Sequence, residues 1–207
     1  MEFFSPLLLS ISSNLDTFRI SNFQGIKKIP ISKFQIIIIS IITTISTFCS
    51  MYLGVFIKKF LLNEILVLFG CVVLIFIGIY FFVEYIRMQK KRLGKDTYYY
   101  VENTSNFSVI LNEGDFSKVA NSNNISFKNS LLLALNLSKN NLGFGILGGL
   151  IGINIPISVF FNFIVTILSI IVGEYLSKTS FSKFIIKYSY LICGFIVIIL
   201  GIYQYFV

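Results

Sequence analysis

Long apolar stretches separated by short polar segments dominate the chain. A helix that crosses the hydrocarbon core of a bilayer, which is about 30 Å thick, needs roughly 20 predominantly apolar residues. Stretches of that length cover residues 3–23, 34–57, 61–85, 127–150, 157–176 and 188–207 of the 207-residue chain. The pattern therefore predicts an all-α integral membrane protein with six transmembrane helices.

The two halves of the chain align with each other. "NLDTFRIS" at 14–21 matches "SKNNLGFG" at 138–145, which sets Asp16 opposite Asn140. Further along, "TFCSMYLGVFIKK" matches "TILSIIVGEYLSK" without a gap, and "FIGIYFF" matches "ILGIYQY". These matches keep the same order in both halves, so we expect an internal repeat.

The repeat divides the chain into three parts. A first three-helix repeat covers 1–85, a polar cytoplasmic loop covers 86–126, and a second three-helix repeat covers 127–207. Because a unit of three helices starts its second copy on the opposite side of the membrane, the two copies are inverted. Inverted 3+3 repeats are a transporter architecture whose site lies near the midplane between the copies. The glycines of 143–152 mark either an interrupted helix at such a site or close helix packing.

The basic residues are distributed by connection. The chain has a net charge of +8, and its lysines and arginines concentrate in the first, third and fifth connections, whereas the opposite side has Lys58 and Lys59. The positive-inside rule places those three connections in the cytoplasm and both termini on the extracytoplasmic side of the cell membrane. Basic clusters beside spanning helices are expected from orientation and anionic lipid, so the predicted partner is the lipid bilayer and not nucleic acid.

Residue types that the chain lacks exclude several chemistries. It has no histidine, which removes histidine metal sites, proton relays and catalytic triads. Cys49, Cys71 and Cys193 fall in apolar stretches without a CxxC spacing, so each is expected to behave as a small hydrophobe. No nucleophile with a positioned base is visible, so we expect neither an enzyme nor a resident cofactor.

Several short patterns together resemble a known family. They are "SNLDTF" in the first stretch, the basic segment "GIKKIPIS" directly after that stretch, and "LALN" followed by "NNLGFG" in the fourth stretch. In this order, and with glycines in the second and fifth stretches, they make the chain similar to sporulation membrane proteins of the YtaF type, relatives of the MntP-like manganese efflux pumps. The resemblance implies a transporter-like protein of the cell membrane that acts in sporulation, with other sporulation membrane proteins or a second copy as partners.

The resemblance also implies a central site. In the manganese pumps two equivalent helices each present an aspartate, and carboxylate oxygens suit a hard cation such as Mn²⁺. Carried over, these positions are Asp16 and Asn140, the candidate ligands for a transported Mn²⁺. The second carboxylate is absent here, and Arg19 and Lys139 bring positive charge where the family has small or apolar residues.

Lys139 is distinguished by its depth. It stands twelve residues after the start of the fourth stretch, so at 1.5 Å per residue it lies about 18 Å deep, where an unpaired charge costs several kcal/mol. Asp16, at the near-equivalent position of the other half, is its expected partner, and Arg19 is expected to extend toward the lipid headgroups. The predicted central polar site consists of Asn14, Asp16, Arg19, Lys139, Asn140 and Asn141.

Two functions stay open at this point. One is an active exporter of a divalent cation that uses Asp16, Asn140 and Asn141, with Lys139 as a titrating or competing charge. The other is a membrane protein that keeps the pump architecture without transporting, is locked by a pair between Asp16 and Lys139, and acts through partners during sporulation. The missing second carboxylate favours the second function.

Overall fold

The fold is all-α. The computed structural model describes residues 3–26, 31–60, 63–92, 127–179 and 181–206. The helices in these residues are α1 (Phe4–Ile26), α2 (Lys33–Lys58), α3 (Asn63–Arg92), α7 (Phe127–Leu150), α8 (Ile155–Leu176) and α9 (Phe181–Phe206). The all-α part of the predicted fold class is thereby confirmed. α3 continues to Arg92, past its predicted end at 85, and the remainder of the predicted polar loop lies outside the described residues.

Local caps set where helices begin and end. α2 begins after Ser32, whose Oγ accepts a hydrogen bond from the Gln35 N–H (3.3 Å), while Gln35 Oε1 accepts one from the Ser32 N–H (2.9 Å). α7 ends before Gly152, whose φ of +83° lies in the left-handed region that favours glycine. The N–H of Ile153 then donates to the Gly148 carbonyl oxygen at 3.0 Å. This closed turn leads directly into α8.

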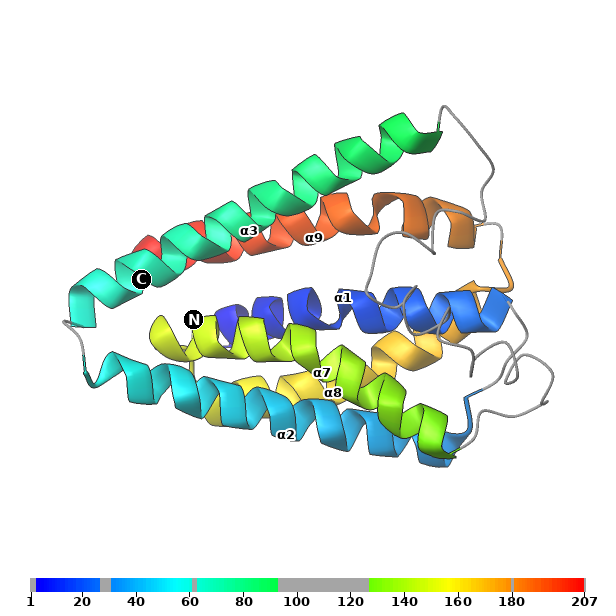
Figure 1. The fold of residues 1–207 in the computed structure, drawn as a ribbon, viewed down its shortest axis with the longest axis horizontal. Coiled ribbons are helices and arrows are strands. Elements are labelled where there is room, and N and C mark those ends of the chain that lie inside the picture. The colour runs from blue at the N-terminus through cyan, green and yellow to red at the C-terminus, as the bar shows by residue number, and fades with distance from the viewer. Residues whose placement is uncertain (1–2, 27–30, 61–62, 93–126, 180, 207) are drawn as a thin grey trace.

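The helices pack in pairs. α1 lies against α8, α2 against α7, and α3 against α9, while further contacts join α2 to α8 and α1 to α9. In Figure 1, α3 and α9 form one side of the bundle, and α1, α2, α7 and α8 form the other. Buried apolar side chains join the two sides, and they include Leu9, Leu74, Leu147 and Val197.

Glycines allow the paired helices to approach closely. A Cβ at Gly54 of α2 would collide with the Ile146 carbonyl oxygen of α7. A Cβ at Gly173 of α8 would lie 2.7 Å from the Phe18 carbonyl oxygen of α1. α7 runs without interruption, and its Gly145, Gly148 and Gly149 allow close packing, as at Gly149 against α2.

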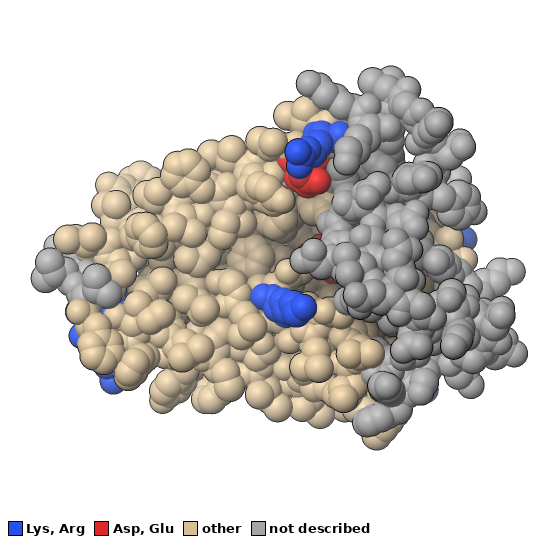
Figure 2. All heavy atoms as spheres, viewed as in Figure 1, with Lys and Arg blue, Asp and Glu red and all other residues tan. Residues whose placement is uncertain are grey.

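Four of the described helices are long and apolar enough to cross a membrane. They are α2, Ile65–Arg87 of α3, α8, and Tyr188–Phe206 of α9. α1 and α7 have 23 and 24 residues but carry a run of polar residues at their centres. Large apolar side chains such as Phe34 and Phe76 are exposed, and the face shown in Figure 2 is largely uncharged. This surface is typical of a protein surrounded by lipid.

Candidate functional site

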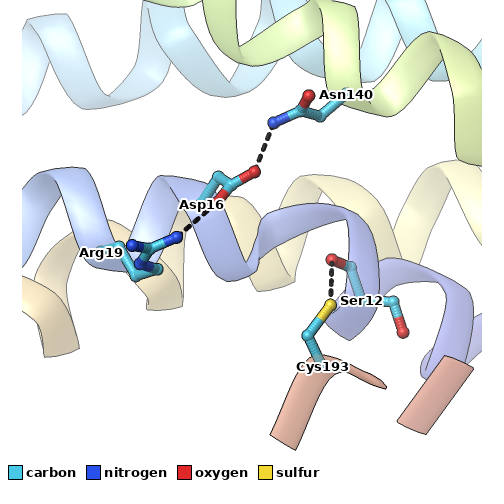
Figure 3. Close-up of polar contacts among 5 residues, drawn as sticks. All are labelled: Ser12, Asp16, Arg19, Asn140 and Cys193. Carbon is cyan, nitrogen blue, oxygen red and sulfur yellow. Dashed lines mark hydrogen bonds and ion pairs between the residues drawn. The ribbon is translucent and has the colours of Figure 1, made fainter. Parts of the chain in front are cut away.

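The predicted site residues lie at the middle of α1 and α7. Asp16 projects from the centre of α1, and Arg19 follows it one turn later on the same helix. Arg19 Nη1 lies 3.3 Å from Asp16 Oδ1, which makes an ion pair (Figure 3). The Arg19 guanidinium carbon also lies 3.9 Å from the centroid of the Tyr190 ring in α9, a cation–π contact.

This position of Arg19 corrects the expectation that its side chain extends toward the headgroups. The side chain is only 12% exposed, because it lies between the Asp16 carboxylate and the Tyr190 ring. An arginine held by a carboxylate and an aromatic face has its charge compensated locally. It therefore has no need to reach the membrane surface.

Asn140 of α7 completes the environment of Asp16. Asn140 Nδ2 donates a hydrogen bond to Asp16 Oδ2 at 2.5 Å (Figure 3). The two residues that the internal alignment sets opposite each other are thus in contact, across the α1–α7 boundary. One oxygen of the Asp16 carboxylate faces Arg19 and the other faces Asn140, so both oxygens already have a donor.

The expected pair between Asp16 and Lys139 is wrong. Asp16 forms its ion pair with Arg19, and Lys139 is exposed, without an ion pair or hydrogen bond to any described residue. The reason lies in helix geometry: successive residues point about 100° apart around an α-helix. Because Asn140 faces α1, the adjacent Lys139 faces outward.

Asn14 belongs to a second polar cluster, between α1, α8 and α2. Its Nδ2 donates to Asn162 Oδ1 at 2.7 Å, and its Oδ1 accepts a hydrogen bond from Thr166 Oγ1 at 2.7 Å. The hydroxyl of Thr166 also lies 3.5 Å from that of Thr43. These side chains are almost completely buried, and none is charged. We call Asn14, Thr43, Asn162 and Thr166 the amide–hydroxyl cluster.

Sequence reasoning missed the α2 and α8 members of this cluster. A signal for them exists, because Ser158, Asn162 and Thr166 recur at four-residue spacing within an otherwise apolar helix. Such spacing puts all three on one face. A polar face on a membrane helix indicates contact with other helices and not with lipid.

Asn141 is buried on the α2 side of α7. It is 1% exposed, and its backbone carbonyl oxygen accepts a hydrogen bond from Ser50 Oγ at 3.4 Å. The side-chain amide has no hydrogen-bond partner in the described part of the chain. The structure therefore separates Asn141 from the contact between Asp16 and Asn140.

The site has few of the ligands that a metal requires. Among the described residues, no three His, Cys, Asp or Glu side chains come together in a group that could hold a metal ion. The Sγ of Cys193 lies 3.9 Å from the Ser12 carbonyl oxygen (Figure 3), and this cysteine is buried in an apolar cluster together with Cys71. The geometry thus combines one compensated carboxylate with neutral amides and hydroxyls.

Comparison with known proteins assigns no family. The chain matches no family model, no curated protein and no solved structure. The resemblance to YtaF-type proteins therefore rests on the sequence patterns alone. Function has to be argued from the geometry of the site.

Proposed function

We propose that the chain is a polytopic membrane protein of six spans, built as a 3+3 inverted repeat with the architecture of a cation efflux transporter, which does not export manganese. The helix contacts support the repeat. In the repeat, α1 corresponds to α7, α2 to α8, and α3 to α9. The contact of α1 with α8 therefore has its counterpart in the contact of α7 with α2, and both contacts are present. The α3–α9 and α2–α8 contacts each join two corresponding helices, as a twofold axis between the halves requires.

The register of α3 against α9 supports the same symmetry. A Cβ at Gly78 would lie 2.8 Å from the Gly194 carbonyl oxygen, and one at Gly201 would lie 3.0 Å from the Cys71 carbonyl oxygen. The internal alignment pairs Gly78 with Gly201 and, continued at the same register, Gly194 with Cys71. One contact is therefore the symmetry counterpart of the other.

The polar residues of α1 and α7 are compatible with six spans. At 1.5 Å per residue, helices of this length extend about 35 Å, enough for the hydrocarbon core. Several of their polar side chains are turned inward: Asn14 and Thr17 of α1 are buried, as are Ser138 and Asn141 of α7. A polar helix can cross a bilayer when other helices enclose its polar face.

The occupied carboxylate of Asp16 carries the functional part of the proposal. A divalent cation at this position would have to displace both Arg19 and Asn140, which now bind the two carboxylate oxygens. It would also lie beside a guanidinium charge, and the described residues that bind Asp16 include no second carboxylate. Hard divalent cations require several oxygen ligands, usually with carboxylates among them. We therefore favour a protein that keeps the pump architecture without its transport.

The location and biological role belong to the same proposal. The distribution of lysines and arginines supports a cell-membrane protein with both termini extracytoplasmic. The resemblance to YtaF-type proteins supports a role in sporulation, exerted through contacts with other membrane proteins. A protein without a transported substrate acts through such contacts.

Export of Mn²⁺ is the second candidate function, and one observation favours it. Asp16 and Asn140, the two positions that the resemblance implies as metal ligands, contact each other at 2.5 Å. If Arg19 were to move away from Asp16, two oxygen-bearing side chains would remain together on two different helices. Transporters bind ions in such positions between their repeats.

Manganese tolerance distinguishes the two functions. The chain is expressed in cells that lack their own manganese exporter, and growth and cell-associated manganese are measured over a range of added Mn²⁺. We expect no gain in tolerance from the wild-type chain at a membrane abundance matched to that of a known exporter. Restored tolerance that is lost in Asp16→Asn would overturn the proposal in favour of export. The double variant Arg19→Ala/Asn140→Asp supplies two carboxylates without the guanidinium, and we expect it to bind Mn²⁺ more tightly than the wild-type chain.

A further inference from the structure

One face of α7 is unpartnered and points away from the other helices. Leu132, Leu135, Lys139 and Leu142 follow each other at spacings of three or four residues, so they share one face of the helix. Leu132, Leu135 and Leu142 are each about two-fifths to one-half exposed, and Lys139 is exposed as well. At Gly143 an added Cβ would have no atom within 4 Å. We call these five residues the outer face of α7.

Lys139 lies at the middle of this apolar face. It is twelve residues from the start of a 24-residue helix, so its Cα is about 18 Å from either end. Under the six-span architecture proposed above, on which this inference rests, the ammonium group lies near the bilayer midplane. A lysine on a helix centre facing lipid is costly by several kcal/mol unless a counter-charge reaches it.

The described part of this chain offers no counter-charge for Lys139. Asp16 is held by Arg19 and Asn140 on the other side of α7. Glu84 pairs with Arg87 at 3.7 Å toward the end of α3, and Glu174 lies two residues before the end of α8. A second copy brings the same acids in the same positions, so it has no outward carboxylate at this depth among these residues.

We propose that the outer face of α7 docks a membrane-spanning helix of a different protein, which carries an aspartate or glutamate at the middle of its span. The carboxylate pairs with the Lys139 ammonium, the exposed leucines pack against apolar side chains of the partner, and the open space at Gly143 lets the partner backbone come close. In lipid the hydrophobic effect does not favour contact between helices over contact with lipid, so small residues and interhelical polar contacts drive helix association. Charge complementarity selects this partner over a purely apolar helix.

Designed peptides test the charge requirement directly. The full-length chain, labelled with a fluorescent donor, is reconstituted in vesicles with acceptor-labelled polyleucine peptides that carry Asp, Leu or Lys at the middle of the span. We expect the Asp peptide to associate about tenfold more tightly than the Leu peptide, as one interhelical polar contact in lipid predicts. The Lys peptide should associate least. Equal association of the Asp and Leu peptides would overturn the inference.

Variants of the chain show whether Lys139 is the residue responsible. Lys139→Leu should abolish the preference for the Asp peptide, and Lys139→Asp should transfer the preference to the Lys peptide. Lys178→Leu is the matched control, because Lys178 is also exposed but follows the end of α8, and it should leave the preference unchanged. Two copies of the chain, one with the donor label and one with the acceptor label, test for self-association. Energy transfer between them that disappears in Lys139→Leu would show that a second copy occupies the outer face of α7, and would overturn the assignment to another protein.

A depth measurement separates this inference from the proposed architecture. The chain contains no tryptophan, so Leu142→Trp introduces a single tryptophan, excited selectively at wavelengths longer than those that tyrosine absorbs, on the outer face of α7. Strong quenching by lipids brominated deep in the acyl chains would show that α7 spans the bilayer, and a missing Asp preference would then count against the docking site alone. Absence of quenching would instead refute the six-span architecture.

Discussion

Removal of the Asp16 carboxylate should destabilise the bundle through Arg19. In Asp16→Leu the guanidinium keeps its Tyr190 contact but loses its counter-charge while remaining only 12% exposed. Loss of one partner from a buried ion pair costs about 3–5 kcal/mol. The Asp16 side chain is 36% exposed, and solvent screening at such a position reduces the expected loss to about 2 kcal/mol.

The double variant tests whether the two charges act as a pair. Arg19→Leu alone leaves Asp16 with the Asn140 amide, so we expect it to lose about 1–2 kcal/mol, including the cation–π contact. Asp16→Leu/Arg19→Leu leaves neither member of the pair without its counter-charge. Its loss in free energy of unfolding should be smaller than the sum of the two single losses by at least about 1 kcal/mol. Unfolding by SDS in bicelles, followed by helical circular dichroism, measures these differences.

Lys139→Leu provides the matched control for this cycle. Lys139→Leu removes a charge that faces lipid, so it should not destabilise the bundle. Because Lys139 faces away from Asp16, its effect should add independently to that of Asp16→Leu. Additive losses for Asp16 and Arg19 would refute the ion pair as a stabilising contact. A coupling of Asp16 to Lys139 larger than its coupling to Arg19 would refute the geometry of the site.

Two further predictions concern packing and topology. Gly54→Ala should cost about 1–3 kcal/mol of stability, because its Cβ would collide with the α7 backbone. Gly143→Ala, where the space is open, should be neutral or stabilising by up to about 1 kcal/mol; equal effects of the two alanines in the same unfolding assay would contradict the packing. In a cysteine-free background, a membrane-impermeant thiol reagent added outside intact cells should label cysteine at position 154 and not at position 178. The reverse labelling would invert the orientation.

Apolar stretch length and internal alignment predict much of this fold. The apolar stretches locate the helices because length and hydrophobicity are properties of each segment by itself. The alignment also sets Asp16 opposite Asn140, and the structure places these two side chains in contact. The proposed inverted repeat accounts for this contact, since equivalent positions would meet where the two copies cross. The location of each helix depends on many residues together, so an error of one residue changes it little.

Other features depend on a single residue's direction and were therefore missed. The charges predicted a pair between Asp16 and Lys139, but a shift of one residue along α7 turns a side chain by about 100°, so Asn140 faces Asp16 and Lys139 points away from it. The aromatic partner of Arg19 is far away in the sequence, on α9, and no local pattern indicates it. The amide–hydroxyl cluster required both the spacing within α8 and the knowledge that α8 packs against α1.

The distribution of charge between the inside and the outside of the bundle connects the two proposals. An ion pump needs a central charge that its substrate compensates, so the empty site is incomplete within the protein. Here the central carboxylate is compensated by Arg19 and Asn140, and the side chains around Asn14 are neutral and largely hydrogen-bonded to one another. Among the described residues near the middle of the helices, the charge without an ion pair is that of Lys139, on the outer face of α7. Under the two proposals, a chain whose central carboxylate is compensated and whose outer face carries a lysine binds another membrane helix and not an ion.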